Sequence, residues 1–173
     1  MCIRDRKINV LDIEQDLYCV GNTLSVAETE IGMIGVNICA DNFQNSLAIG
    51  HMQARMGAHF IFSPSAWAVD PDHDDVKHPY GEEWRRSYSE LSRLYGITMV
   101  GVSNVGWIDA GPWKGRKVIG CSLAVGPDGE VLAKGPYGHD AWALITLTVQ
   151  ARPRDVKGTD YGPYLKGRGY EGP

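Results

Sequence analysis

Cys39 is the residue of this chain whose type and position best suit nucleophilic chemistry. It follows an apolar run, residues 31–38, and a helix-like pattern begins within a few residues after it. A thiol on a tight turn between a buried strand and a helix lies at the rim of a sheet. There, backbone N–H groups and the positive end of the helix favour the reactive thiolate. The alternative is a small buried hydrophobic side chain, the commonest role of a free cysteine.

The other chemistry-bearing residue types show no metal-binding pattern. The four cysteines lack the paired spacing of metal ligands and the density of a disulfide scaffold, so we expect reduced thiols. The five histidines include no H-E-x-x-H pair, and His73 and His78 fall in an acidic, proline-flanked stretch typical of a loop. The sequence therefore predicts neither a metal site nor a cofactor.

Two strands joined by a helix are expected to position Cys39. The run that leads to Cys39 predicts the first strand, and residues 59–63 predict the second. Between them, apolar residues recur at helical spacing up to Gly57, with Asp41 or Asn42 as the helix N-cap. A strand, a helix and a strand in this order form a βαβ unit, which implies parallel pairing. A strand at 23–26 could form a hairpin with the first of these strands.

The rest of the chain predicts one more helix and several strands. The helix spans 82–94, with Trp84, Tyr88, Leu91 and Tyr95 as its apolar stripe and Gly96 as its end. The expected later elements are a strand at 97–102, a loop at 106–115, a hairpin of 121–125 with 130–133, and a last strand at 141–149. Residues 69–81 read as an exposed loop that could form a lid or rim. After Arg152 the Gly- and Tyr-rich chain is expected to wrap a surface or meet a partner chain.

Composition and charge exclude several classes of protein. A chain of 173 residues with 43% hydrophobic residues predicts one globular unit. A net charge of −4 with scattered Lys and Arg gives no case for binding nucleic acid or an anionic membrane. No stretch is apolar enough to span a bilayer, and the first residues lack the apolar core of a secretory signal. We therefore expect a small-molecule partner and a cytoplasmic location.

Several short motifs stand in an order that resembles the carbon–nitrogen hydrolase, or nitrilase, superfamily. Each motif alone is common, but their ordered co-occurrence from about Lys7 to Val149 is specific. The motifs are Lys7-Ile8-Asn9, Glu14, the strand ending in Cys39, Pro64-Ser65-Ala66-Trp67, Trp84, Asn104, Gly120-Cys121-Ser122 and Pro127-Asp128-Gly129.

The resemblance implies catalytic roles for four residues. Cys39 would attack the carbonyl carbon, and Lys7 with the Ala40 backbone N–H would stabilise the oxyanion. Glu14 would position Lys7 or the substrate. Without the resemblance, Lys7 reads as a surface charge and Glu14 as a solvated carboxylate.

The resemblance also implies substrate contacts. Ala40, Phe43, Trp67 and Asn104 are the residues expected to bind the substrate, although Asn104 alone would read as a turn residue. Trp and Glu usually follow the cysteine of true nitrilases, and here Ala40 and Asp41 stand there instead. We therefore expect an amidase or carbamoyl hydrolase that acts through a cysteine thioester on a small amide-type molecule.

The fold implied is α/β with a mixed sheet: a partial αββα sandwich of the nitrilase type, in which the βαβ unit is followed by hairpins. The family places a further glutamate, the general base, before the lysine, whereas no Glu precedes Lys7 here. The chain thus resembles a C-terminal portion that lacks the first catalytic glutamate, with sheet edges that favour aggregation. Residues 1–6 are expected to be a non-native leader, 7–150 the hydrolase domain and 151–173 the tail.

Two other interpretations stay open. A catalytically inactive relative could use the sandwich as a binding or oligomerisation module, and family members commonly form homo-oligomers. A flavodoxin-like domain would also contain the βαβ unit, but no G-x-G-x-x-G follows a strand.

Overall fold

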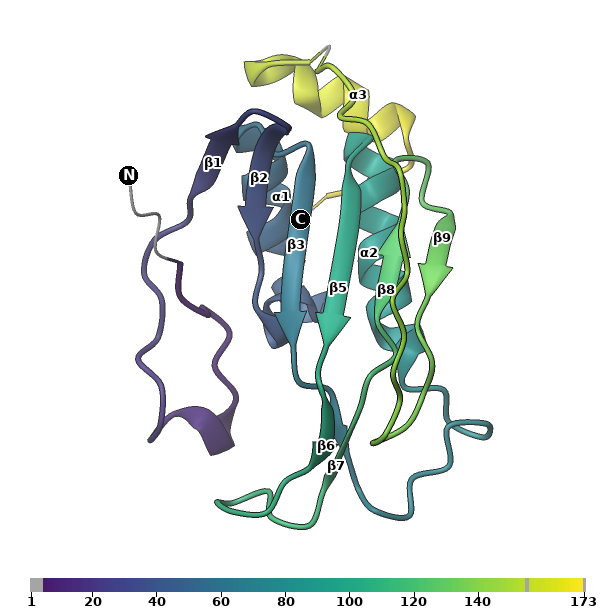
Figure 1. The fold of residues 1–173 in the computed structure, drawn as a ribbon. Helices are drawn as coiled ribbons and strands as arrows, with labels where there is room; N and C mark the ends of the chain where they lie inside the picture. The colour runs from purple at the N-terminus through teal and green to yellow at the C-terminus, as the bar shows by residue number, and fades with distance from the viewer. Residues whose placement is uncertain (1–4, 155, 173) are drawn as a thin grey trace.

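A mixed six-stranded sheet forms the body of the computed structural model, which describes residues 5–154 and 156–172 (Figure 1). Its strands lie in the order β1, β2, β3, β5, β8, β9. The central strands β2, β3 and β5 run parallel, and antiparallel strands flank them on both sides. The strands of this sheet are β1 (Val26–Thr29), β2 (Gly32–Val36), β3 (Phe60–Ser65), β5 (Thr98–Ser103), β8 (Leu123–Val125) and β9 (Val131–Lys134). The α/β class with a mixed sheet is therefore confirmed.

The predicted βαβ unit is confirmed. α1 (Leu47–Met56) connects β2 to its parallel neighbour β3 and ends at Gly57, whose φ of 124° suits glycine. The predicted N-cap was wrong, because Ser46 rather than Asp41 or Asn42 precedes the helix. Two 3-10 turns, Cys39–Asn42 and Gln44–Ser46, separate Cys39 from α1.

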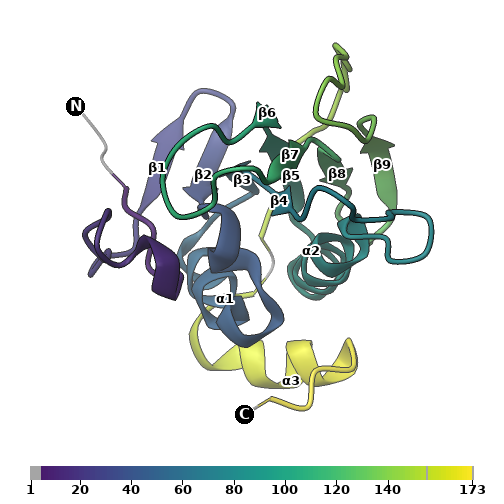
Figure 2. The same cartoon turned by 90° about the horizontal axis from the view of Figure 1, so that it is seen from below.

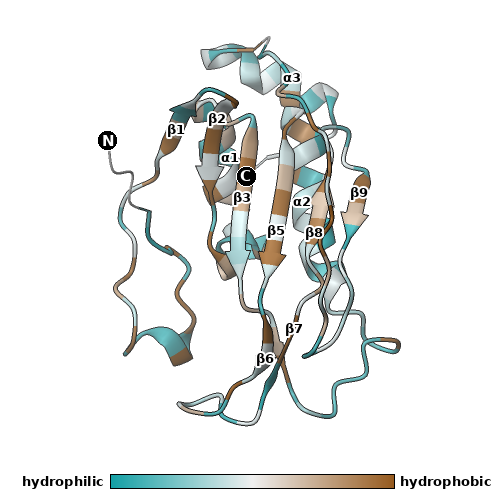
Figure 3. Ribbon diagram, viewed as in Figure 1, coloured by the Kyte–Doolittle hydropathy of each residue, from teal (hydrophilic) through white to brown (hydrophobic). Residues whose placement is uncertain are grey.

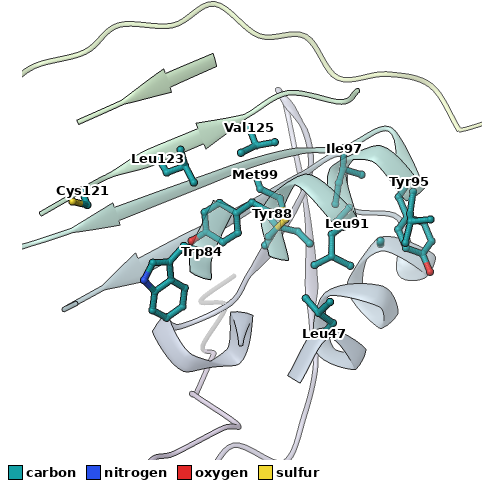
Figure 4. Packing of buried hydrophobic residues seen from close by; sticks show 14 of the residues in the cluster. Leu47, Trp84, Tyr88, Leu91, Tyr95, Ile97, Met99, Cys121, Leu123 and Val125 are labelled. Carbon is teal, nitrogen blue, oxygen red and sulfur yellow. The ribbon is translucent and has the colours of Figure 1, made fainter. Parts of the chain in front are cut away.

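Helix α1 and the second helix, α2 (Gly81–Tyr95), cover one face of the sheet and bury its apolar residues (Figure 2). α2 presents the predicted stripe, and all four of its members are buried. Figure 4 shows this stripe facing residues of the strands, among them Met99 and Leu123. Gly96 ends α2 in the left-handed conformation, with a φ of 66°, as glycine does at many helix ends.

The loop predicted at 106–115 is shorter than expected. A small three-stranded sheet lies at the carboxyl ends of the parallel strands and consists of β4 (Ala68–Val69), β6 (Val105–Trp107) and β7 (Lys117–Ile119). β6 and β7 form a hairpin that the Gly- and Pro-rich composition did not reveal. The hairpin of β8 with β9 and the hairpin of β1 with β2 were both expected, although β1 starts three residues later than predicted.

The strand predicted at 141–149 was wrong. This segment runs without a ladder across the sheet face opposite α1 and α2, where Trp142 and Leu144 are 89% and 88% exposed. β-branched residues favour a strand only where a neighbouring strand offers hydrogen-bond partners, and β5 and β8 already pair on both sides. The segment and the sheet border an open hollow of about 370 Å³. Figure 3 shows that β5 and β8 consist largely of apolar residues, drawn in brown.

The chain after Arg152 contains a helix that the sequence did not predict. α3 (Tyr161–Gly167) follows a 3-10 turn, Gly158–Asp160, and lies at the end of the sheet opposite the small sheet. Tyr161 is buried between Arg55 of α1 and Tyr95 of α2. The tail thus packs on the domain's own surface, while a contact with a second copy stays a prediction. The domain limits are untested, and positions 1–4 of the expected leader lie outside the described residues.

Candidate active site

Cys39 occupies a special backbone position at the end of the strand that carries it. Its φ is 48°, a left-handed value that is rare for any residue except glycine. The residue starts the 3-10 turn Cys39–Asn42 directly beyond β2, at the edge of the sheet where the parallel strands end. The predicted sharp turn is present, but a 3-10 turn rather than an α-helix follows the thiol.

The environment of Cys39 does not favour the thiolate as strongly as expected. Burial raises the pKa of the Cys39 thiol above its ordinary value. Backbone hydrogen bonds from Ala66 and Ala40 and the charge of Lys7 lower this pKa, while Glu14 raises it. The polar groups around the sulfur therefore offset only part of the cost of burying a thiolate.

Lys7 and Glu14 form an ion pair beside Cys39. The Lys7 Nζ bonds the Glu14 carboxylate, and Lys7 is only 9% exposed. Glu14 ends the 3-10 turn Asp12–Glu14, and its Oε2 also accepts the backbone N–H of Leu11 at 3.0 Å. Because the charges of both residues act on Cys39, the structure brings together the three residues that the sequence suggested as catalytic.

Ala40 directly follows Cys39 in the 3-10 turn. Its side chain is fully buried, and its backbone N–H lies near enough to the Cys39 sulfur to lower the pKa of that thiol. A backbone N–H beside the sulfur and the Lys7 ammonium can both donate to an oxygen that develops charge during attack at Cys39. The arrangement can therefore support addition of a thiolate to a carbonyl carbon.

The aromatic residues near the site form a stack around Trp84. The ring centroids of Trp67 and Trp84 are 4.7 Å apart, and the two rings are nearly parallel. The Phe43 ring stacks on Trp84 with its centroid 5.2 Å away. Trp67 is completely buried, so its observed role is packing. A direct substrate contact by Phe43 or Trp67 stays a prediction.

Asn104 lies between β5 and β6, and its side chain is exposed. Its backbone N–H donates to Ser65 O at 3.1 Å, and the residue borders the hollow on the face opposite the helices. Among residues 5–154 and 156–172, no hydrogen bond involves its side chain. Substrate binding by Asn104 likewise stays a prediction.

Two features of the site were missed by the sequence analysis. Beneath Cys39, the Asn42 Nδ2 donates to Cys39 O at 3.2 Å and to Ser63 Oγ at 2.9 Å, which ties the turn to β3. Tyr80 is the last residue before α2 and lies near Cys39. Burial raises the pKa of Tyr80, and the negative charge of a Cys39 thiolate raises it further. An aromatic residue at the end of the acidic loop was the available signal for the second feature.

Other classes of site receive no support from the described residues. Within them, no three His, Cys, Asp or Glu side chains gather as a metal ion would require. None of the helices described combines the length and apolar character needed to cross a membrane. Absence of a cofactor and a cytoplasmic location remain predictions.

The pH dependence of alkylation tests the environment of Cys39. A raised pKa leaves less thiolate at neutral pH, so iodoacetamide should label Cys39 more slowly than glutathione at pH 7.5. Its labelling rate should also continue to rise at a pH where glutathione has reached its plateau. Peptide mass spectrometry gives the rate for Cys39 alone. A Cys39 profile that reaches its plateau below that of glutathione would contradict the buried environment.

Comparisons with known proteins show the family of the chain. A family model described as carbon-nitrogen hydrolase matches residues 3–157. The omega-amidase, chloroplastic, of Arabidopsis thaliana is 30% identical over 141 residues, which cover 75% of this chain and 34% of that relative.

Solved structures share the fold. A carbon-nitrogen hydrolase from Helicobacter pylori G27 superposes with a TM-score of 0.67 at 22% identity, covering 76% of this chain and 47% of that one. An amidase from Nesterenkonia sp. gives a TM-score of 0.58 at 20% identity over 78% of this chain and 46% of the other. The chain thus spans about a third of the curated relative and about half of these solved structures.

Proposed function

Because the chain belongs to the carbon-nitrogen hydrolase family, we propose that Cys39 cleaves the carbon–nitrogen bond of a small amide through a thioester. The observation that carries the proposal is the convergence of Cys39, Lys7 and Glu14 from separate segments at the carboxyl edge of the sheet. Three such groups at one edge supply a nucleophile, a cation and a carboxylate.

The reaction follows from these positions. The Cys39 thiolate adds to the carbonyl carbon, and the oxyanion that forms lies between the Lys7 ammonium and the Ala40 backbone N–H. Collapse of this intermediate breaks the C–N bond, and the nitrogen leaves as ammonia after taking up one proton, which balances the proton that the Cys39 thiol lost. A water molecule then attacks the thioester, which releases the carboxylic acid and restores the Cys39 thiol. Glu14 holds the Lys7 ammonium in place through their ion pair.

The substrate class we propose is a terminal carboxamide. The name omega-amidase of the Arabidopsis relative supports a small molecule with its amide at one end, and the names of the Nesterenkonia structures support an amide rather than a nitrile. An N-carbamoyl compound is the neighbouring class to test, because it presents the same carbonyl carbon and amino leaving group.

Ammonia release from a substrate panel tests the proposal. We expect the chain to release ammonia from the monoamide of a short dicarboxylic acid, and Cys39→Ala to reduce that rate to the background hydrolysis. Intact-protein mass spectrometry after an acid quench should show the acyl group on Cys39. Cys19→Ser is the matched control, because Cys19 is an exposed thiol outside the group described above. An ammonia rate that survives Cys39→Ala, or the absence of both ammonia and the acyl adduct, would refute the proposal.

A non-catalytic binding role is the second candidate. The raised pKa of Cys39 favours it, because a thiol that stays protonated at neutral pH is a poor nucleophile. Among the described carboxylates, Glu14 is the one whose charge acts on Cys39, and Glu14 is already bound to Lys7. Saturable binding of the monoamide, measured by calorimetry, without ammonia or an acyl adduct would favour this candidate.

A further inference from the structure

A buried carboxylate connects the segment that carries Lys7 to the turn that carries Cys39. Asp41 is 3% exposed, and its Oδ1 accepts the backbone N–H groups of Ile8 at 3.0 Å and Asn9 at 2.6 Å. Its Oδ2 accepts the backbone N–H of Ile38 at 2.9 Å, one residue before the nucleophile. One side chain thus holds the residues next to Lys7 and next to Cys39 at the same time.

Asn9 completes the connection from the other side. Its Nδ2 donates to Ala40 O at 2.8 Å and to Ser46 Oγ at 2.7 Å. Three hydrogen bonds therefore join residues 8–9 to the turn Cys39–Asn42 and a fourth joins Asn9 to the next turn, and each has its donor in the segment of Lys7. Because Ala40 O is held in this way, the peptide unit between Ala40 and Asp41 is fixed as well.

The two oxygens of the Asp41 carboxyl group suit this role. A buried carboxylate is costly unless hydrogen bonds compensate for the lost water, and a carboxylate can accept several N–H groups where an amide oxygen accepts fewer. In the part of the chain that the structure describes, no Lys or Arg side chain forms a salt bridge with Asp41. The three backbone donors are therefore the partners that this carboxylate binds.

We propose that Asp41 is a positioning residue whose carboxylate, bound to the backbone of Ile8 and Asn9, holds Lys7 beside Cys39. The inference rests on the proposed roles of Lys7 and Cys39 in the reaction, and goes beyond them by naming what keeps the cation at the thiol. Without this carboxylate, the segment before Glu14 loses the backbone bonds of Ile8 and Asn9 to the turn and keeps only the bond of the Asn9 side chain to Ala40 O. The Lys7 ammonium is then held less firmly relative to the sulfur.

A double-mutant cycle read out by Cys39 labelling tests the proposal without requiring turnover. The rates of iodoacetamide labelling at Cys39 are measured from pH 6 to 10 in the wild type, Lys7→Met, Asp41→Asn and the double variant. Lys7→Met alone should slow labelling at pH 7.5 by about threefold or more, because a nearby cation stabilises the thiolate. In the Asp41→Asn background, Lys7→Met should change the logarithm of the Cys39 labelling rate by less than about half as much as it does in the wild type.

Matched variants separate positioning from general destabilisation. Asp74→Asn is the matched control. Asp74 also accepts two backbone N–H groups, those of Val76 and Lys77, but it lies in the loop before α2 and not beside Cys39. The full Lys7 effect should persist in that background. If circular dichroism shows that Asp41→Asn is unfolded, Asn9→Ala replaces it, because this change removes only the Nδ2 bonds to Ala40 and Ser46.

The outcomes are distinct. A Lys7 effect of equal size with and without the Asp41 or Asn9 change would overturn the proposal, and so would a Lys7→Met variant that labels at the wild-type rate. Ammonia release reports on the proposed function separately. A chain that releases no ammonia but shows the expected cycle would keep Asp41 as the positioning residue and refute hydrolysis.

Discussion

Replacing Lys7 by methionine is expected to slow amide hydrolysis by about a hundredfold or more, the typical cost of removing one preorganised donor to an oxyanion. Methionine keeps much of the length and the apolar stem of lysine but carries neither the charge nor the N–H donors. Lys7 is 9% exposed and its ammonium acts on Cys39, so solvent cannot replace it easily. The loss should fall mainly on kcat, because the oxyanion exists only after attack has begun.

The control for this prediction is Lys114→Met. Lys114 is exposed in the loop between β6 and β7, and its loss should leave the hydrolysis rate unchanged within about twofold. Initial rates of ammonia release over a range of substrate concentrations separate kcat from KM. A Lys7→Met enzyme that retains more than about a third of the wild-type kcat would remove Lys7 from the proposed reaction.

A second variant separates chemistry from folding. Lys7→Met leaves the Glu14 carboxylate, 21% exposed, without its cation, which destabilises the segment around it. Lys7→Met with Glu14→Gln removes that unpaired charge. The double variant should recover stability in urea unfolding while its hydrolysis rate stays low. Recovery of the rate together with stability would mean that Lys7 acts through folding alone.

The elements around Cys39 were predictable because their signals are local. The apolar run before Cys39, the helical spacing up to Gly57 and the stripe of α2 each lie within a short window, and periodicity reads such windows well. The order of strand, helix and strand then implies a parallel pair, so the position of Cys39 at the sheet edge follows from the sequence.

The partners of Cys39 were not predictable from local patterns. Lys7 and Glu14 lie in a segment without regular spacing, and only the resemblance to a family suggested them. The bonds between Asp41 and the backbone of Ile8 and Asn9 join positions more than thirty residues apart, so no periodicity could indicate them. Asp41 instead looked like a helix cap, a role that polar residues before a helix often have.

The two errors near the C-terminus have one physical cause, which is that tertiary contacts override local propensity. Residues 141–149 have strand propensity but no strand beside them to complete a ladder. α3 contains Gly162, Pro163 and Gly167, which disfavour a helix, yet it forms where Tyr161 and Leu165 become buried.

Replacing Trp84 by alanine is expected to lower the free energy of unfolding by about 3–5 kcal/mol, the usual range for a buried tryptophan. Trp84 is fully buried on α2 and stacks with both Trp67 and Phe43, so alanine would leave a cavity between a helix and the two segments that border Cys39. Urea unfolding followed by circular dichroism measures the loss. Trp142→Ala is the control, because this tryptophan is 89% exposed and its loss should change stability by about 0.5 kcal/mol or less.

Trp84→Phe shows which property of the tryptophan matters. The Trp84 Nε1 is buried and has no hydrogen-bond partner among the described residues, so removal of the indole N–H offsets part of the lost packing. We expect Trp84→Phe to cost less than about 2 kcal/mol and to keep the Cys39 labelling profile. A Trp84→Ala protein within about 1 kcal/mol of the wild type would contradict the packing role. If the prediction holds, the aromatic stack behind Cys39 is part of the core that fixes the site, and the polar groups around the thiol depend on it for their positions.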